Sequence, residues 1–126
     1  MRFILLLLFP LLFVGCSQTI NQQMKHHEKY YQTLLCDKLH GEMEFVLEDR
    51  TRVDCLTDEY AIEVDFAKKW AESIGQSLFY AHMTGKEPAV GLIIDTSKES
   101  RYLKRLDVIA QEYGIKIFIL QKYPQE

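Results

Sequence analysis

Three carboxylates on two neighbouring predicted strands are the side chains in this sequence best suited to chemistry. Asp54 lies in the first of these strands, and Glu63 and Asp65 lie two positions apart in the second. Side chains two apart on a strand share a face, so Glu63 and Asp65 are predicted to project together. Carboxylate oxygens are hard ligands that suit Mg²⁺ or Mn²⁺, and such a cation polarises a phosphoryl oxygen and acidifies a bound water. The pattern therefore indicates a divalent-metal site suited to phosphoryl chemistry.

The helix predicted directly after the second strand brings further polar groups to this region. Lys69 lies seven residues, or two helical turns, before Gln76, and Tyr80 follows one turn later on the same face. Gln76 and Tyr80 are suited to fixing a phosphate, or the lysine, by hydrogen bonds. Two plainer interpretations stay open. The carboxylates are also typical of the solvated face of a half-exposed meander, and Gln76 and Tyr80 are also typical of exposed helix residues.

The elements that position these residues follow from hydrophobic periodicity. The pattern predicts, in chain order, a helix over 28–39, strands over 43–47, 52–56 and 61–66, a helix over 67–83, a strand over 89–94, a helix ending at Gly114 and a strand over 115–120. Short links favour an antiparallel meander of the first three strands, and the later strand–helix–strand links favour parallel pairing. The sequence thus predicts an α/β fold, a mixed five-stranded sheet flanked by helices in the order α-β-β-β-α-β-α-β.

The three predicted helices each have an apolar stripe that is expected to face the core. These stripes are Tyr31, Leu34, Leu35 and Leu39 in the first helix, Trp70, Ala71, Ile74, Leu78 and Ala81 in the second, and Leu103, Leu106, Ile109, Ala110 and Tyr113 in the third. Thr96 and Glu99 are predicted to form a capping box at the start of the third helix.

The order of these elements, with Asp54 on one strand and Glu63-x-Asp65 on the next, resembles the restriction-endonuclease-like PD-(D/E)xK nuclease superfamily. The segment from Gln76 to Tyr80 matches the Gln-x-x-x-Tyr element of the exonuclease branch of that family. The resemblance covers about residues 28–120. It implies a nuclease-like hydrolase that uses Mg²⁺ or Mn²⁺, with Asp54, Glu63 and Asp65 as metal ligands. It also implies an upstream acid, for which Glu44 is the candidate and Glu42 the alternative.

One position departs from the family pattern, because Asp65 stands where the family has lysine. In the family that lysine helps to activate the attacking water, and an aspartate binds metal but supplies no cation. Lys69 on the following helix is the candidate replacement, as in relatives that draw their lysine from that helix. Lys68 lies about 80 degrees further round the helix and is the weaker choice. Two functions follow from this departure: a metal-dependent phosphodiesterase, or a catalytically inactive module that keeps the fold for binding or assembly.

The first fifteen residues have the features of an export signal. Arg2 is a short basic region, and the apolar segment from Ile4 to Val14 is too short to span a bilayer comfortably. The segment from Leu12 to Cys16 resembles the lipobox of bacterial lipoproteins, which implies cleavage after residue 15 and acylation of Cys16. An ordinary signal peptide with an incidental Cys16 is the alternative.

The lipoprotein resemblance also predicts the location and layout of the mature chain. A lipid on Cys16 would hold the protein on a membrane in the bacterial cell envelope, facing the periplasm, and Ser17 favours the outer membrane by the same resemblance. Residues 16–27 are polar and lack periodicity, which predicts a tether. The domain is then expected over 28–122, with a short tail over 123–126.

With Cys16 assigned to the lipid, Cys36 and Cys55 remain as a pair in an oxidising compartment. A disulfide between them would contribute about 3 kcal/mol to stability. Two small buried hydrophobic residues are the alternative, and we favour the disulfide. A zinc site is not supported, because the sequence lacks a Cys-x-x-Cys pair and its histidines are either adjacent or isolated (His26, His27, His40 and His82).

The formal net charge of −3 gives the chain no overall attraction to nucleic acid. A nucleic-acid partner would therefore need a local basic surface. The third predicted helix carries basic residues at helical spacing, which suit either phosphate contacts or simple solubility: Lys98, Arg101, Lys104 and Arg105.

Overall fold

The computed structural model describes the backbone of residues 19–122 and the side chains of residues 28–122. The elements in chain order are α1 (Thr19–Lys38), β1 (Glu42–Val46), β2 (Arg52–Leu56), β3 (Tyr60–Phe66), a 3-10 turn η1 (Ala67–Lys69), α2 (Trp70–Thr84), β4 (Glu87–Ile94), α3 (Ser100–Tyr113) and β5 (Lys116–Gln121). The predicted signal peptide, the predicted lipidation of Cys16 and the predicted tail over 123–126 lie outside the described residues.

The strands form one mixed sheet in the order β1-β2-β3-β4-β5. β1, β2 and β3 pair antiparallel through short turns, whereas β4 pairs parallel with both β3 and β5. Parallel neighbours require a crossover, and α2 and α3 supply the two crossovers. The structure thereby confirms the predicted α/β class, a five-stranded mixed sheet flanked by helices.

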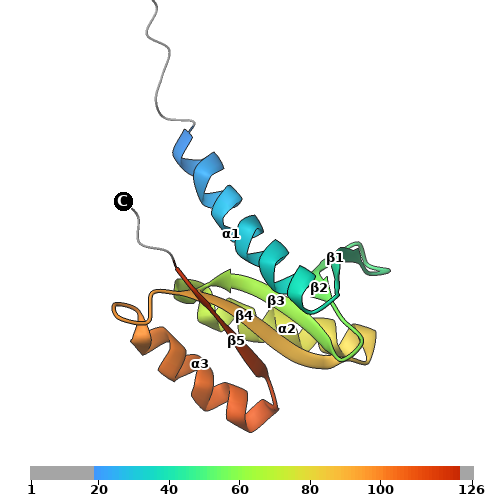
Figure 1. Ribbon diagram of the computed structural model, residues 1–126. Coiled ribbons are helices and arrows are strands. Elements are labelled where there is room, and N and C mark those ends of the chain that lie inside the picture. The colour runs from blue at the N-terminus through green and yellow to red at the C-terminus, as the bar shows by residue number, and fades with distance from the viewer. Residues whose placement is uncertain (1–18, 123–126) are drawn as a thin grey trace, which may run out of the picture.

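The helices cover both faces of the sheet (Figure 1). On one face, α1 packs over β3 and β4 around Tyr31, Leu35 and Val64. On the other face, α2 and α3 enclose a second core that includes Leu92 and Leu106. β4 lies between the two cores, which explains why its sequence is apolar without alternation.

The first helix begins earlier than the sequence predicted. The segment assigned to a polar tether is helical from Thr19 onward, so α1 runs continuously into the part that packs on the sheet. This segment contains neither glycine nor proline, and Gln, Met and Lys are good helix formers. A helix already fixed by packing adds further turns easily, because propagation costs far less than nucleation.

The face of α2 that meets the sheet also differs from the prediction. Ala71, assigned to the core stripe, is exposed, whereas Ser73 and Ser77 are fully buried. Their hydroxyls donate to the carbonyls of Lys69 and Ile74 in the preceding turn, so burying them leaves no polar group unpaired. Small side chains at this contact bring α2 close to the strands that carry the acidic residues.

The start and end of α3 differ from the prediction as well. Thr96 and Glu99 form no capping box, since the helix begins at Ser100 with no side-chain cap. Instead, Asp95 accepts hydrogen bonds from the backbone and hydroxyl of Ser97 and so holds the turn before the helix. Tyr113, expected to face inward, is the last residue of the helix and is 60% exposed.

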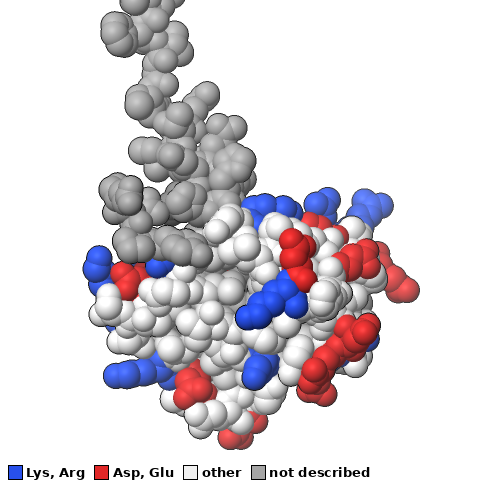
Figure 2. Space-filling model, in the orientation of Figure 1, with Lys and Arg blue, Asp and Glu red and all other residues white. Residues whose placement is uncertain are grey.

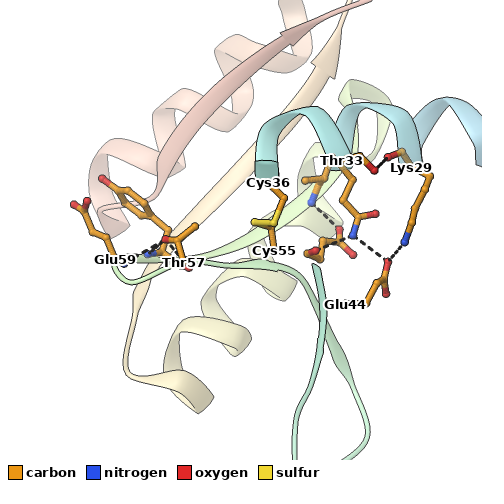
Figure 3. The surroundings of a disulfide bond; sticks show 11 residues. Lys29, Thr33, Cys36, Glu44, Cys55, Thr57 and Glu59 are labelled. Atoms are coloured by element: carbon orange, nitrogen blue, oxygen red, sulfur yellow. Dashed lines mark hydrogen bonds and ion pairs between the residues drawn. A yellow bond between two sulfur atoms is a disulfide. The ribbon is translucent and has the colours of Figure 1, made fainter. Parts of the chain in front are cut away.

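Cys36 of α1 and Cys55 of β2 form a disulfide, with their Cα atoms 5.6 Å apart (Figure 3). Both cysteines are fully buried. Gly41 lies against the bond, and a Cβ at that position would come within 2.5 Å of the Cys55 sulfur. The disulfide thus joins the first helix to the strand of Asp54 at a point where the chain has no room for a larger side chain.

None of the helices within residues 19–122 combines the length and the apolar character needed to cross a bilayer.

Candidate functional site

Three acidic residues lie next to one another across the first three strands. In the register of β1 on β2, Glu44 lies between the pairs Met43–Cys55 and Phe45–Val53, level with Asp54. The register of β2 on β3, continued by one position, places Asp54 opposite Glu63. Asp65 follows on the same face of β3 as Glu63. Like charges directly opposite one another on neighbouring strands repel, so this arrangement needs bound protons or a cation.

Asp54 lies where β2 and β3 separate. In the described sheet these two strands pair at only two positions, the last being Cys55 with Ile62. Beyond that point the carboxylate of Asp54 replaces the backbone as acceptor, because its Oδ2 accepts a 2.8 Å hydrogen bond from the Val64 amide. The backbone carbonyl of Asp54 accepts instead from the side chain of Gln32 in α1, at 2.7 Å. Asp54 therefore lies at the base of a fork, the point where β2 and β3 stop pairing and diverge.

Glu63 and Asp65 are buried, with exposed fractions of 6% and 5%. The solvated face of a meander, which the sequence left open as an interpretation, does not describe these two residues. Burial, followed by the charges of Asp54 and Asp65, raises the pKa of Glu63 to about 9. Burial is also the main reason why the pKa of Asp54 is raised to about 6, although the hydrogen bond from the Val64 amide opposes the shift.

Asp54 and Glu63 share a hydrogen bond between their carboxyl groups. Two ionised carboxylates cannot make such a bond, since an ionised carboxylate only accepts. The raised pKa of Glu63 therefore favours its protonated form near neutral pH, with Asp54 as the acceptor. A proton on Glu63 offsets part of the negative charge that these buried carboxyl groups bring together.

Lys69 lies beside the cluster, as predicted for the candidate replacement cation. Its Nζ is 3.7 Å from Oδ1 of Asp65, which also accepts a 2.7 Å hydrogen bond from the Phe66 amide. The pKa of Asp65 is raised by burial, while the Phe66 amide and Lys69 act to lower it. The side chain of Lys69 is 53% exposed, so it reaches the acids from the solvent side.

Tyr80 of α2 is packed close to the acids from the other side. Its ring is 6% exposed and lies against Val53 and Ala61. Burial and the charge of Glu63 raise the pKa of the Tyr80 phenol, and a hydrogen bond with Gln76 opposes the shift. Gln76 is itself exposed. The two residues therefore act as a pair, with Tyr80 next to Glu63 and Gln76 at the rim.

Comparison with known proteins found no matching family, no matching curated protein and no matching solved structure.

Of the two candidates for the upstream acid, Glu44 lies beside these carboxylates, whereas Glu42 is exposed. Glu44 Oε1 accepts 3.0 Å bonds from Lys29 and from Gln32 of α1 (Figure 3). Burial acts to raise the pKa of Glu44, but these hydrogen bonds lower it below its ordinary value. Glu44 has a φ of 56°, a left-handed conformation that costs a non-glycine residue roughly 1 kcal/mol or more. The backbone of β1 is thus strained at the residue that meets α1.

Glu28 and Gln32 are site residues that the sequence analysis missed. The pKa of Glu28 is raised by burial and next by the charge of Asp65, so its carboxylate lies near the other acids. Gln32 is 3% exposed and contacts both Asp54 and Glu44. The missed signal is the spacing of Glu28, Gln32 and Cys36 at successive fourth positions, which places all three on one helix face.

We refer to Glu28, Glu44, Asp54, Glu63 and Asp65 together as the acid cluster. Across residues 28–122, no three His, Cys, Asp or Glu side chains already form an arrangement that would hold a metal ion. The donors nevertheless fit Mg²⁺ or Mn²⁺ by chemistry, since all are carboxylates and the pair at the fork holds a proton that a cation would displace. Asp54, Glu63 and Asp65 are the residues that would hold it.

The remaining candidate residues do not join this site. His40 and His82 are exposed, and the side chains of His26 and His27 lie outside the described residues. The predicted basic face of α3 is exposed, where Arg101 stacks on the ring of Tyr102. On the face of the molecule in Figure 2, acidic and basic side chains are interspersed.

Proposed function

We propose that this chain is a metal-dependent phosphodiesterase of the restriction-endonuclease-like type, a nuclease-like hydrolase held at a membrane. The observation that supports it most directly is the position of Asp54 opposite Glu63 at a strand fork, with both pKa values raised. Strongly perturbed carboxyls that converge from different strands are typical of functional sites. The absence of lysine at position 65 is offset by Lys69, whose Nζ lies 3.7 Å from Asp65.

The chain's own residues divide the work of such a reaction. A bound Mg²⁺ or Mn²⁺ supplies Lewis acidity and a water of lowered pKa. Asp54, Glu63 and Asp65 would hold that cation, and the pair Asp54 and Glu63 would release its proton to do so. Lys69, reaching in from solvent, neutralises charge that builds on the phosphate. The buried Tyr80 limits water on the α2 side, and the exposed Gln76 donates hydrogen bonds at the rim.

One observation favours a second function at the same site. Lys69 is half exposed, and Asp65 is hydrogen-bonded to the Phe66 amide as a structural residue would be. A catalytically inactive module would keep the fold and the acid cluster but bind a partner or an ion without cleaving a bond. The two functions agree on metal binding and differ on turnover.

Hydrolysis by the purified chain separates these two functions. We expect Mn²⁺ to stabilise the protein, by about 2.7 kcal/mol when the cation is at one hundred times its dissociation constant. We also expect Mn²⁺ or Mg²⁺ to support cleavage of a phosphodiester, assayed on bis-p-nitrophenyl phosphate and on DNA and RNA. EDTA should abolish the cleavage. Stabilisation without cleavage of any of these substrates would favour the inactive module. The absence of both stabilisation and cleavage would contradict the proposed metal site.

The membrane location is a separate part of the proposal. We expect Cys16 to carry acyl chains, so that the protein partitions with membranes after the cells are broken. The measurement is incorporation of labelled palmitate into the wild-type chain and into Cys16→Ser, which should incorporate none and be released in soluble form. Equal labelling of the two chains, or no labelling of either, contradicts the lipoprotein assignment.

A further inference from the structure

We infer that Gln32, together with the Cys36–Cys55 disulfide, positions Asp54 for cation binding and holds Glu44 beside it. The inference rests on the proposed function for the cation and on the contacts of α1 for the positioning. It assigns α1 a role in the site beyond covering the sheet, and it makes Gln32 a positioning residue, because it acts through the two acids.

Gln32 connects the two acids with a single amide group. Its Nε2 donates a 2.7 Å hydrogen bond to the carbonyl oxygen of Asp54 and a 3.0 Å hydrogen bond to Oε1 of Glu44. An amide nitrogen carries two hydrogens, so these two bonds use its full donor capacity. The side chain is 3% exposed, which makes water a poor replacement for either partner.

Two attachments therefore hold β2 where it leaves β3. Cys55 is fixed to α1 by the disulfide, and the adjacent carbonyl of Asp54 is fixed to α1 by Gln32, one helical turn before Cys36. With the carbonyl held, the Asp54 carboxylate is directed to the Val64 amide. Because the described pairing of β2 with β3 ends at Cys55, Asp54 would be free to turn away from Glu63 without these attachments.

Lys29 does not substitute for Gln32. It bonds to Glu44 at 3.0 Å, but its side chain is 52% exposed and no described contact joins it to Asp54. An exposed ion pair of this kind is worth at most about 1 kcal/mol. The buried amide is the group that connects the two strands to the helix.

The test is Gln32→Met, which keeps the length of the side chain and removes both donors. We expect the Val64 amide to exchange its hydrogen at least about tenfold faster relative to the amides of β4, measured by NMR on the purified chain without metal. We expect the Mn²⁺ dissociation constant to rise about 10- to 100-fold, as is typical when a partner of a metal ligand is lost. Gln111→Met is the matched control, since Gln111 bonds to Asp107 on the exposed face of α3.

The exchange of the Val64 amide decides the positioning role. Unchanged exchange in a folded Gln32→Met chain overturns the inference, whatever happens to Mn²⁺ affinity. Faster exchange in a chain whose wild-type form binds no Mn²⁺ supports the positioning role and removes the proposed function. Gln32→Asn, which keeps the amide but shortens its reach, provides the same comparison if the methionine variant does not fold.

Discussion

Glu63→Gln is expected to make the metal-free protein more stable at pH 8 and, in the same chain, to remove metal-dependent hydrolysis. Glutamine keeps the shape of the side chain and still donates a hydrogen bond to Asp54, as protonated Glu63 does. It has no charge to be penalised by burial. Glutamine is also a neutral and weaker metal ligand than glutamate. Losing a residue that only hydrogen-bonds to a metal ligand lowers activity by up to about a hundredfold, so we expect loss of the ligand itself to lower hydrolysis by at least that much.

The stability change has a defined pH window. The pKa of Glu63 is about 9 in the folded protein, against 4.5 for a free side chain. Below pH 4.5 both states are protonated and stability is unaffected. As the pH rises from 4.5 to 9, unfolding releases a proton, so wild-type stability falls by up to about 1.4 kcal/mol per pH unit. Asp54 contributes a similar fall that ends near its pKa of about 6.

Between pH 6 and pH 9 the slope therefore belongs mainly to Glu63. The measurement is the free energy of unfolding in urea with EDTA, at pH 6, 7 and 8, for wild type and Glu63→Gln. We expect the wild type to lose stability across this range and the variant to stay nearly level. Parallel curves for the two proteins would show that Glu63 is ionised in the folded state and that no proton is held at the fork.

Lys69→Ala is expected to lower hydrolysis by about a hundred- to a thousandfold, the cost of losing one group that stabilises developing charge. The same change should leave stability nearly unaltered, because the Lys69 side chain is half exposed and its ion pair with Asp65 is largely screened. The measurement is the rate at saturating Mn²⁺ alongside the melting temperature.

Lys68→Ala is the matched control for this change. Lys68 is the adjacent exposed lysine, but its charge acts on Glu99 before α3 rather than on the acid cluster. We expect it to retain wild-type activity. Equal activity of Lys69→Ala and wild type would show that the missing lysine has no substitute there. Equal losses in both variants would point to general attraction of the substrate rather than to a specific cation.

The alternating strand pattern made the β3 part of the site predictable. Glu63 and Asp65 were expected on one face of a strand, and the apolar run of β4 indicated burial on both faces. Both expectations depend on the two-residue period of a strand, which is visible in a short segment. The five-stranded mixed sheet flanked by helices followed from counting such segments and the lengths of their links.

Tertiary contacts determine which polar residues of α1 and α2 are buried, and the hydrophobic pattern did not predict these residues. Glu28 and Gln32 share a helix face with Cys36, but their polar residue types gave no reason to expect that this face is buried against the strands. For α2 the periodicity favoured Ala71 over Ser73 and Ser77, since serine is rarely assigned to a core. The serines can be buried because each hydroxyl donates a hydrogen bond to a backbone carbonyl in the preceding turn. The residue type alone does not show that this bond forms.

The early start of α1 has a consequence for where the protein can work. Ser17 and Gln18 alone separate Cys16 from Thr19, and the helix then rises about 14 Å before it reaches Glu28. A lipid on Cys16 would then connect to the acid cluster through a short helix instead of a flexible linker. The proposed site would then reach only a thin layer next to the lipid headgroups, and ligands at greater distances would have to come to that surface.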